Sequence, residues 1–359
     1  MSYPSEPAPA SARRPPRRRS PIGWMALVAG VIGIVGAAGV LRAADARISD
    51  VERISGLGGV LADVPDEDDP TIEYPAENYL LVGSDTREGV DTDDTDFGAI
   101  GTESDVTGRR SDTIMVLRQE RNGGAALISL PRDLWVEIAG TGKSQRINSA
   151  YNEGPERLAA TVSQSLGIPV HHYVEVDFQG FKDIIDDLGG VEVCVAYGAR
   201  DVKSGLQINP GCQQLDGVQA LAFARSRTYE QWDGTDWVLD PRADLGRIER
   251  QQLFMRAAVD GALRKLQSSP FSSGDVIEAV VNSVRIDDRL DPIKAGEALR
   301  QAAEVGLRTY QLPVYSDTVG DASILRLGDG AEAVLAYFRG DGPAPTEFET
   351  GETASALDG

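Results

Sequence analysis

The sequence predicts a layered α/β domain behind one membrane-spanning segment. Short apolar runs typical of strands alternate with stretches of helical periodicity between residues 76 and 342, an order typical of a sheet covered by helices. That stretch contains no internal repeat and no clear break, which favours one large domain. Upstream of it, a single run of nineteen uncharged residues is long enough to cross a bilayer.

The N-terminal part predicts the topology of the chain. Residues 1–22 are rich in Pro, Ala, Ser and Arg, a composition that predicts a disordered basic tail. Residues 23–41 follow as a transmembrane anchor, which at about 1.5 Å per residue spans about 28 Å. The arginines ahead of the anchor predict a cytoplasmic N-terminus and an extracytoplasmic remainder. A cleaved signal peptide is the alternative, but its apolar core is normally shorter, and Arg42 lies close to the weak cleavage match at 44–46.

The elements of the folded region follow an extracytoplasmic linker, predicted at residues 42–75, that ends in a cluster of acids. Apolar runs predict strands at residues 79–83, 113–117, 125–130, 173–176, 191–195 and 309–314. Helical spacing predicts helices at residues 155–166, 178–188, 243–266, 274–285, 292–304 and 330–339. Residues 91–105 carry many acids without the frame of a calcium loop, so we expect a solvated insertion there. Residues 343–359 are expected to form a disordered tail.

The composition excludes some classes of function. A formal charge of −21 argues against non-specific binding of nucleic acid, which needs a basic face. Cys194 and Cys212 lie outside the membrane on the predicted topology, where pairs usually oxidise, so we expect a disulfide; two reduced, buried thiols are the alternative. His171 and His172 are adjacent and would point to opposite faces of a strand, which disfavours a metal site.

Charged residues stand at the ends of the predicted elements in four groups. Three of them follow or open predicted strands: Gly83-Ser84-Asp85, Arg110-Ser111-Asp112 and Pro131-Arg132-Asp133. The fourth begins the helix predicted at 243–266, where Arg247, Arg250 and Gln251 fall on one face. The stretch 220-ALAFARSR-227 adds Arg225 and Arg227; interpreted as a strand, it places both on one face with Phe223.

These residue types together favour a site for a phosphate ester. Arginine forks bind phosphate oxygens two at a time, and carboxylates such as Asp85 and Asp112 are typical ligands of a divalent cation that bridges those oxygens. Two arginines near a helix N-terminus, Arg247 and Arg250, are favourable if an anion is bound between them. For any single Arg–Asp pair, the alternative is a salt bridge that fixes a loop.

Seven blocks of sequence, taken in order, are similar to one family. They are 78-NYLLVGSDTR-87, 110-RSDTIMVLR-118, 127-LISLPRDLWV-136, 147-INSAYNEG-154, 173-YVEVDFQGFKDIIDDLGGVEV-193, 214-QLDGVQALAFARSR-227 and 246-GRIERQQ-252. In these blocks, over about residues 76–342, the chain resembles the LytR-CpsA-Psr family of bacterial cell-envelope proteins. The resemblance implies a single α/β/α sandwich around a central mixed sheet, with a hydrophobic pocket for a lipid. From the sequence, Phe178, Phe181, Ile184 and Ile185 either line that pocket or belong to an ordinary core.

The resemblance also implies a phosphotransferase with its substrates and site. Such an enzyme moves a glycopolymer from a polyprenyl-pyrophosphate carrier to peptidoglycan through a phosphodiester bond, assisted by Mg²⁺ (or Mn²⁺). By motif, Asp85 and Asp112 would bind the metal. The residues implied as catalytic are Arg110, Asp112, Arg132, Asp133 and Arg247, and those implied at the pyrophosphate are Arg225, Arg227, Arg247, Arg250 and Gln251. The proton of the acceptor hydroxyl would go to Asp133, to Asp244 or to a phosphate oxygen of the substrate.

The polymer and the acceptor are less constrained by the sequence. The Arg-rich and Ala-rich composition and the cysteine pair favour an actinobacterial wall and a polymer of the arabinogalactan type. One alternative is a hydrolase that acts on the same lipid-linked glycan with water as acceptor. Another is a non-catalytic protein that binds lipid-linked glycan or regulates envelope genes.

Overall fold

The computed structural model describes residues 51–64, 76–84, 111–226, 228–240, 250, 283–292, 294–295 and 305–345, with Asp112 in its backbone alone. The predicted basic tail, the anchor at 23–41 and the acidic insertion lie outside the described residues, as do most of the predicted helices at 243–266, 274–285 and 292–304 and most of the C-terminal tail. Within the described part of the chain, no helix is both long and apolar enough to cross a membrane.

A mixed sheet of seven strands forms the centre of the fold, in the order β1-β14-β7-β2-β3-β4-β15. Its strands are β1 (Glu52–Ile54), β2 (Ala76–Ser84), β3 (Ser111–Glu120), β4 (Ala125–Ser129), β7 (His172–Asp177), β14 (Val284–Asp287) and β15 (Leu307–Gln311). β2 and β7 are parallel, β3 is antiparallel to both β2 and β4, and β15 is parallel to β4. β2, β4, β7 and β15 therefore end at the same edge of the sheet. The α/β class and the central mixed sheet are confirmed.

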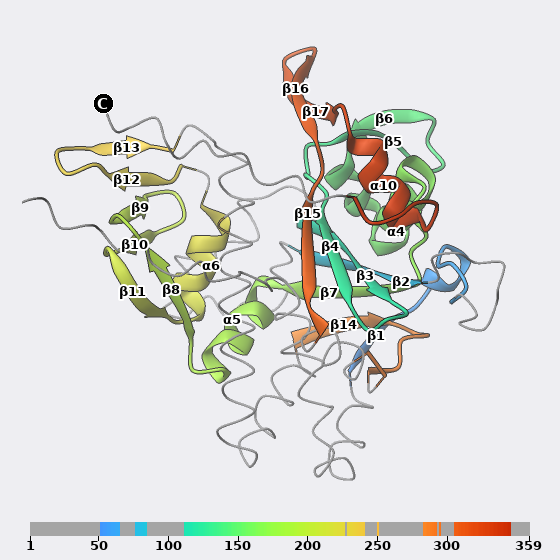
Figure 1. Cartoon of the computed structure of the whole chain (residues 1–359), viewed down its shortest axis with the longest axis horizontal. Coiled ribbons are helices and arrows are strands. Elements are labelled where there is room, and N and C mark those ends of the chain that lie inside the picture. The colour runs from blue at the N-terminus through green and yellow to red at the C-terminus, as the bar shows by residue number, and fades with distance from the viewer. Residues whose placement is uncertain are drawn as a thin grey trace, which may run out of the picture.

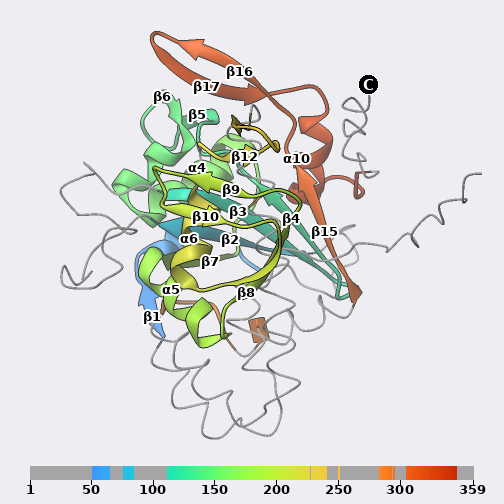
Figure 2. The ribbon, with the colours of Figure 1, turned by 90° about the vertical axis from the view of Figure 1, so that its left-hand side faces the viewer.

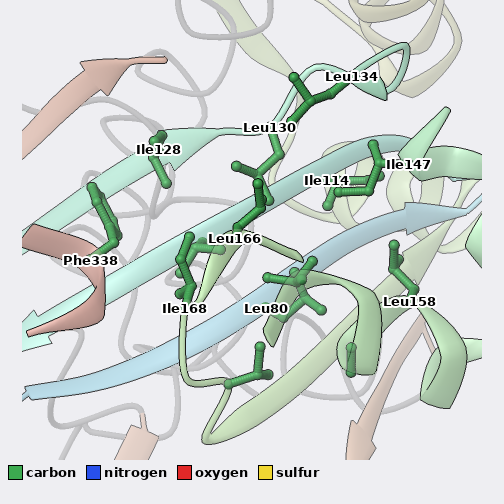
Figure 3. Close-up of a cluster of buried hydrophobic side chains, with 14 of the residues drawn as sticks. Leu80, Ile114, Ile128, Leu130, Leu134, Ile147, Leu158, Leu166, Ile168 and Phe338 are labelled. Atoms are coloured by element: carbon green, nitrogen blue, oxygen red, sulfur yellow. The ribbon is translucent and has the colours of Figure 1, made fainter. Parts of the chain in front are cut away.

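The central strands are buried on both faces, which explains their nearly continuous apolar sequences. Side chains alternate between two cores, so Leu80 of β2 belongs to one core and Leu81 to the other. Figure 3 shows the first of these cores, in which side chains of three neighbouring strands meet side chains of two helices: Leu80, Ile114, Ile128, Leu158, Leu166 and Phe338.

Helices cover both faces of the sheet. α4 (Pro155–Leu166) and α10 (Ala331–Arg339) pack on the face shown in Figure 3, whereas α5 (Phe178–Asp187) contributes to the opposite core. α4 has a proline in its first turn and ends at Gly167, whose φ of 71° suits glycine. The helices predicted at 155–166, 178–188 and 330–339 are thus confirmed, as are the strands predicted at 79–83, 113–117, 125–130, 173–176 and 191–195, and the strand predicted at 309–314 over residues 309–311.

A second group of elements follows β7 and lies beside the carboxyl edge of the sheet, as Figures 1 and 2 show from two directions. We call it the lobe. It consists of α5, β8 (Val191–Val195), β9 (Ala199–Asp201), β10 (Leu206–Ile208), β11 (Gly211–Leu215), α6 (Gly217–Arg225), β12 (Glu230–Trp232) and β13 (Trp237–Leu239). β10, β9, β12 and β13 form one small sheet, and β8 and β11 form a hairpin. Cys194 and Cys212 are register partners in that hairpin and form the predicted disulfide.

Two smaller hairpins follow strands β4 and β15 in the chain. β5 (Trp135–Ile138) pairs with β6 (Lys143–Arg146) ahead of the 3₁₀ segment η3 (Ile147–Glu153), and β16 (Val314–Val319) pairs with β17 (Ala322–Leu327). The β16–β17 hairpin projects from the body of the molecule (Figure 2). An isolated bridge between Leu134 and Leu325 joins it to the chain that follows β4.

Three sequence-based boundaries are corrected. The stretch 220–227 does not begin as a strand, because residues 217–225 form α6, so Phe223 and Arg225 do not share a face; Phe223 is fully buried in the core. Residues 51–64 belong to the fold rather than to a linker, since β1 pairs with β14 and the 3₁₀ turn η1 (Leu57–Gly59) adds Leu57 to the core. The end of the helix predicted at 274–285 is part of β14.

Candidate active site

The candidate active site lies at the edge where β2, β4 and β7 end and β3 begins. Ser84, the last residue of β2, pairs in register with Asp177 of β7 on one side and with Ser111 of β3 on the other. The N–H of Leu130 donates to the carbonyl of Ile114 at 2.9 Å, so the contact between β3 and β4 continues past the end of β4. Three of the four predicted charged groups therefore adjoin one edge, as expected for a ligand site in an α/β fold.

A β-bulge marks the point where β2 meets β3. Gly83 pairs with Thr113 and Ser84 pairs with Ser111, so Asp112 is the extra residue of β3. Bulges of this kind often lie beside active sites. Gly83 is suited to this place, because a Cβ atom there would lie 3.1 Å from the Cβ of Thr113. The predicted metal ligand Asp112 thus lies at an irregular position of the strand.

The loop after β4 holds Arg132 and Asp133 in a defined geometry. The backbone bends at this point because the N–H of Leu134 donates to the carbonyl of Pro131 at 2.9 Å. The guanidinium Nε of Arg132 lies 3.4 Å from Oδ2 of Asp133, and Nε of Arg146 lies 3.3 Å from Oδ1 of the same carboxylate. Asp133 is thus the shared counter-ion of two arginines, both of its oxygens being engaged.

The β16–β17 hairpin fixes that loop from outside. The N–H of Leu325 donates to the carbonyl of Asp133 at 2.9 Å. Arg146 donates from Nη2 to the carbonyl of Ser323 at 2.6 Å while its Nε contacts Asp133. Arg146, which the sequence did not single out, therefore connects the hairpin to the Arg132–Asp133 loop.

Arg225 reaches the same edge from the lobe. It lies in the last turn of α6, where a cation is favourable for the helix dipole. Its guanidinium carbon lies 4.5 Å from the ring centre of Phe178, the residue that follows Asp177 at the end of β7. Neighbouring strands lie about 4.8 Å apart, so the three steps from β7 to β4 cover about 14 Å. Arg225 and the Arg132 loop therefore lie on either side of the end of β2 and the start of β3.

Close packing of two helices sets the position of Arg225. The N–H of Gly217, the first residue of α6, donates to Oδ1 of Asp186 in α5 at 2.7 Å. A Cβ atom on Gly217 would lie 2.7 Å from Cγ of Lys182, so α6 can approach α5 this closely only with glycine there. Asp216 caps α6, forming a capping box with Gln219.

The four residues predicted either to line a lipid pocket or to belong to the core fall into two groups. Ile184 and Ile185 are fully buried members of the main core, which makes them ordinary core residues. Phe178 packs with Leu221 in a small separate cluster, against which Phe181 is partly buried. That cluster lies beside the guanidinium of Arg225 and not in the main core.

Arg250 binds the chain that follows α6. Its Nη2 donates to the carbonyl of Ser226 at 2.8 Å, and its Nη1 donates to Oδ2 of Asp240 at 3.1 Å. The guanidinium also lies 4.2 Å from the ring centre of Tyr229, and only 6% of the residue is exposed. These bonds make Arg250 a clamp, by which we mean a side chain that fixes the segment after Arg225; its predicted place at the pyrophosphate stays a prediction.

Two carboxylates near the edge were missed from the sequence. Asp177 caps α5 by accepting the N–H of Gly180 at 2.7 Å; burial raises its pKa, and that hydrogen bond offsets only part of the rise. Asp201, buried in β9, accepts bonds from the segment that follows Arg225. Its only sequence signal is the stretch Asp201-Val-Lys-Ser-Gly205, typical of a turn in which the carboxylate accepts N–H groups two and three residues on.

The remaining predicted site residues lie outside the described residues, and their assignments stay predictions. They are Asp85, Arg110, Arg227, Arg247, Gln251 and the side chain of Asp112. No cluster of three or more His, Cys, Asp or Glu side chains suited to a metal ion occurs in the part of the chain that the structure describes.

The fold and the candidate site at the carboxyl edge of the sheet can be compared with known proteins. The model of the LytR_cpsA_psr family matches residues 66–334 of this chain. The chain belongs to the LytR_cpsA_psr family. The matched range contains the strands that form the candidate site and each site residue predicted from the sequence.

Relatives in the LytR_cpsA_psr family include proteins with names that describe wall assembly. The chain is 34% identical over 266 residues to "Probable cell wall biosynthesis protein LcpB" of Corynebacterium glutamicum, covering 73% of this chain and 61% of that protein. It is 38% identical over 178 residues to "Polyisoprenyl-teichoic acid–peptidoglycan teichoic acid transferase TagU" of Bacillus mycoides, covering 49% of this chain and 54% of that protein. The chain therefore spans only about half to three fifths of the length of these relatives.

Solved structures of the family have the same fold. The "LytR-Csp2A-Psr enzyme from Actinomyces oris" superposes with a TM-score of 0.60 at 26% sequence identity, covering 80% of this chain and 95% of that chain. The mixed α/β architecture around a central mixed sheet is therefore the architecture of the family.

Proposed function

We propose that this LytR_cpsA_psr protein is a phosphotransferase that moves a glycopolymer from a polyprenyl-pyrophosphate carrier to peptidoglycan through a phosphodiester bond. Family membership and the name of the TagU relative support the reaction class. One observation carries the assignment to a site: β2, β3 and β4 meet at an edge that contains a bulge at Asp112, the Arg132–Asp133 loop and, across β7, Arg225.

The reaction at this edge balances as follows. An acceptor hydroxyl of peptidoglycan forms a bond to the phosphorus that carries the glycan, and the bond from that phosphorus to the bridging oxygen breaks. Polyprenyl phosphate leaves with the electron pair of that bond. Arg225 and Arg132 bind the diphosphate and stabilise the charge that moves onto its bridging oxygen, since positioning and charge stabilisation supply most of the catalysis of phosphoryl transfer.

Asp133 supports this chemistry as the partner of Arg132. Because both of its carboxylate oxygens contact guanidinium groups, at 3.3 and 3.4 Å, we assign it to holding Arg132 in place. The proton of the acceptor hydroxyl then passes to a phosphate oxygen of the donor or to a carboxylate at the edge. Asp244, one of the predicted acceptors, lies outside the described residues.

Mg²⁺ is part of the proposal through Asp85 and Asp112. These two residues follow Ser84 and Ser111 in the sequence, and Ser84 and Ser111 are register partners, so the two predicted ligands adjoin one point of the edge. Two carboxylates together with substrate phosphates are the ligand set that Mg²⁺ usually takes. Bound there, the ion would neutralise charge on the diphosphate oxygens.

The cell compartment and the polymer complete the proposal. The sequence at 23–41 supports a membrane anchor with the catalytic domain outside the membrane, and the Cys194–Cys212 disulfide agrees with an oxidising compartment. The composition supports a polymer of the arabinogalactan type, and the acidic charge supports the absence of a nucleic-acid partner.

The test combines transfer with product analysis. Purified full-length protein is incubated with a polyprenyl-pyrophosphoryl glycan and peptidoglycan, and the glycan is then assayed on the sedimented wall and in solution. We expect wall-bound glycan, and a loss of at least about 100-fold in rate for Arg132→Ala, the size typical of one lost transition-state donor. Arg326→Ala is the matched control, because Arg326 makes an exposed ion pair with Asp317 on the β16–β17 hairpin. Free glycan in place of wall-bound glycan would establish the hydrolase instead, and binding without turnover the non-catalytic protein.

A further inference from the structure

A buried carboxylate, Asp201, lies under the segment that joins α6 to β12. It is only 1% exposed, on the inner face of the small sheet of the lobe. Charged residues are almost never buried to this degree unless they are fully hydrogen-bonded. The hydrogen bonds that Asp201 accepts therefore identify the segments that this carboxylate connects.

The hydrogen bonds that Asp201 accepts from the described residues divide between its two oxygens. Oδ1 accepts the N–H groups of Lys203, at 2.9 Å, and Ser204, at 3.4 Å, and the hydroxyl of Thr228 at 2.7 Å. Oδ2 accepts the hydroxyl of Ser226 at 2.7 Å and the N–H of Thr228 at 2.8 Å. One carboxylate thus joins a turn of the lobe to the segment Ser226–Thr228.

The residues that Asp201 binds stand on both sides of Arg227 and next to Arg225. Ser226 follows Arg225 directly, and Thr228 follows Arg227. Ser226 is completely buried, and its carbonyl is also bound by Arg250 at 2.8 Å. Ser226 is consequently held by both Asp201 and Arg250, and Thr228 is held by Asp201.

We propose that Asp201 is a positioning residue of the transfer reaction, which fixes Ser226 and Thr228 so that Arg225 meets the donor diphosphate at the carboxyl edge of the sheet. The inference rests on the proposed function in assigning the diphosphate as the ligand of Arg225. The ionisation of Asp201 agrees with this role: burial raises its pKa, but the donors of Thr228, Ser226 and Lys203 outweigh burial and lower it to about 2. The carboxylate is therefore charged at neutral pH.

Asp201→Asn removes this function with almost no change in shape. The amide NH₂ must replace either Oδ1, where it faces the N–H of Lys203, or Oδ2, where it faces the N–H of Thr228. Hydroxyl groups can rotate and accept a bond from the amide, but backbone N–H groups cannot. In either orientation, the amide NH₂ of asparagine therefore faces a backbone N–H group, and the hydrogen bond to Lys203 or to Thr228 is lost.

Asp233→Asn is the matched control. Asp233 is an exposed carboxylate of the β12–β13 turn in the same lobe, and its Oδ1 accepts the N–H groups of Thr235 and Asp236 and the hydroxyl of Thr235 at 2.7–2.8 Å. It has the same chemistry as Asp201 without contact to residues 225–228. Thr228→Val is a second, milder variant, because it deletes one donor to Asp201 and keeps the N–H.

The experiment measures the binding of farnesyl pyrophosphate to full-length protein in detergent by calorimetry, at a temperature where circular dichroism shows each variant folded, followed by the transfer assay. We expect Asp201→Asn to raise the Kd by at least about 10-fold and Thr228→Val by a smaller factor, with Asp233→Asn unchanged. A purely structural role would lower the melting temperature of Asp201→Asn and leave the Kd of the folded protein unchanged, and that result would overturn the proposal.

The two readouts separate this inference from the proposed function. If the wild-type protein binds the pyrophosphate but transfers no glycan, the phosphotransferase assignment fails, while the Kd of Asp201→Asn still decides the role of Asp201. If Asp233→Asn weakens binding as much as Asp201→Asn, the effect belongs to the lobe in general and the proposal is wrong.

Discussion

The variant Arg250→Met distinguishes two roles of Arg250, a clamp on the segment after Arg225 and a ligand of the donor diphosphate. The side chains of Arg250 and Asp240 are only 7% and 4% exposed, and the variant removes the guanidinium that donates to Asp240 and to the carbonyl of Ser226. Removing one partner of a buried ion pair typically costs about 3–5 kcal/mol. At about 2–4 °C per kcal/mol for a domain of this size, the melting temperature should fall by about 10 °C.

The assay is denaturant unfolding of the full-length protein. The control is a second arginine that also makes an ion pair beside an aromatic ring but is more exposed. Arg200 forms an ion pair with Glu230 and lies 4.4 Å from the ring centre of Trp237, but its side chain is 39% exposed. Arg200→Met should therefore cost less than about 1 kcal/mol. Asp240→Leu combined with Arg250→Met should recover part of the lost stability, since apolar replacement of both partners of a buried pair is often neutral.

One result would refute the clamp. If Arg250→Met unfolds at the wild-type denaturant concentration but no longer binds farnesyl pyrophosphate, Arg250 contacts the donor directly, as the sequence predicted. Loss of stability that accompanies loss of binding, with stability recovered in the double variant, supports the clamp.

Two further predictions concern the sheet and the lobe. His171 and His172 should make the free energy of unfolding greatest near pH 6.5. Burial lowers the pKa of His171 to about 4, so the free energy of unfolding falls as the pH decreases from 6.5 towards 4. Asp287 and Glu77 outweigh burial and raise the pKa of His172 to about 9, so the free energy of unfolding falls as the pH increases from 6.5 towards 9. Unfolding curves of His172→Gln should lose the alkaline slope, and an unchanged slope would contradict the assignment. Gly217→Ala should cost about 1–3 kcal/mol, because its Cβ meets Lys182; Gly58→Ala, with no atom within 4 Å of its Cβ, should melt like the wild type.

Much of the fold follows from local patterns in the sequence. The central strands have nearly continuous apolar sequences because both faces of the sheet are buried, and α4 has proline and glycine at its two ends. The error at 220–227 was avoidable, since Asp216 and Gln219 are spaced as a capping box that marks the start of a helix. A helix start three residues upstream outweighs the apparent two-residue alternation of ALAFARSR.

The parts of the site that the sequence did not predict depend on contacts between distant residues. β14 lies between β1 and β7 although more than one hundred residues separate it from either in the chain. The bulge at Asp112 depends on the register of β2 against β3, and the bond from Arg250 to Ser226 spans 24 residues. Periodicity reports which face of an element is apolar, but it does not report which partner that face meets.

A few acidic residues of this chain position the arginines of the candidate site or the segments next to them. Three carboxylates that are at most 15% exposed each hold an arginine or the backbone beside one: Asp133 contacts Arg132, Asp240 contacts Arg250, and Asp201 binds the residues after Arg225. Burying these acids costs desolvation energy, which their ion pairs and hydrogen bonds offset. On the proposed function, Arg132 and Arg225 are thereby oriented before the donor binds, and oriented charges stabilise a transition state without reorganising during the reaction. On the same proposal, part of the negative charge of the protein serves to position the arginines that bind the diphosphate.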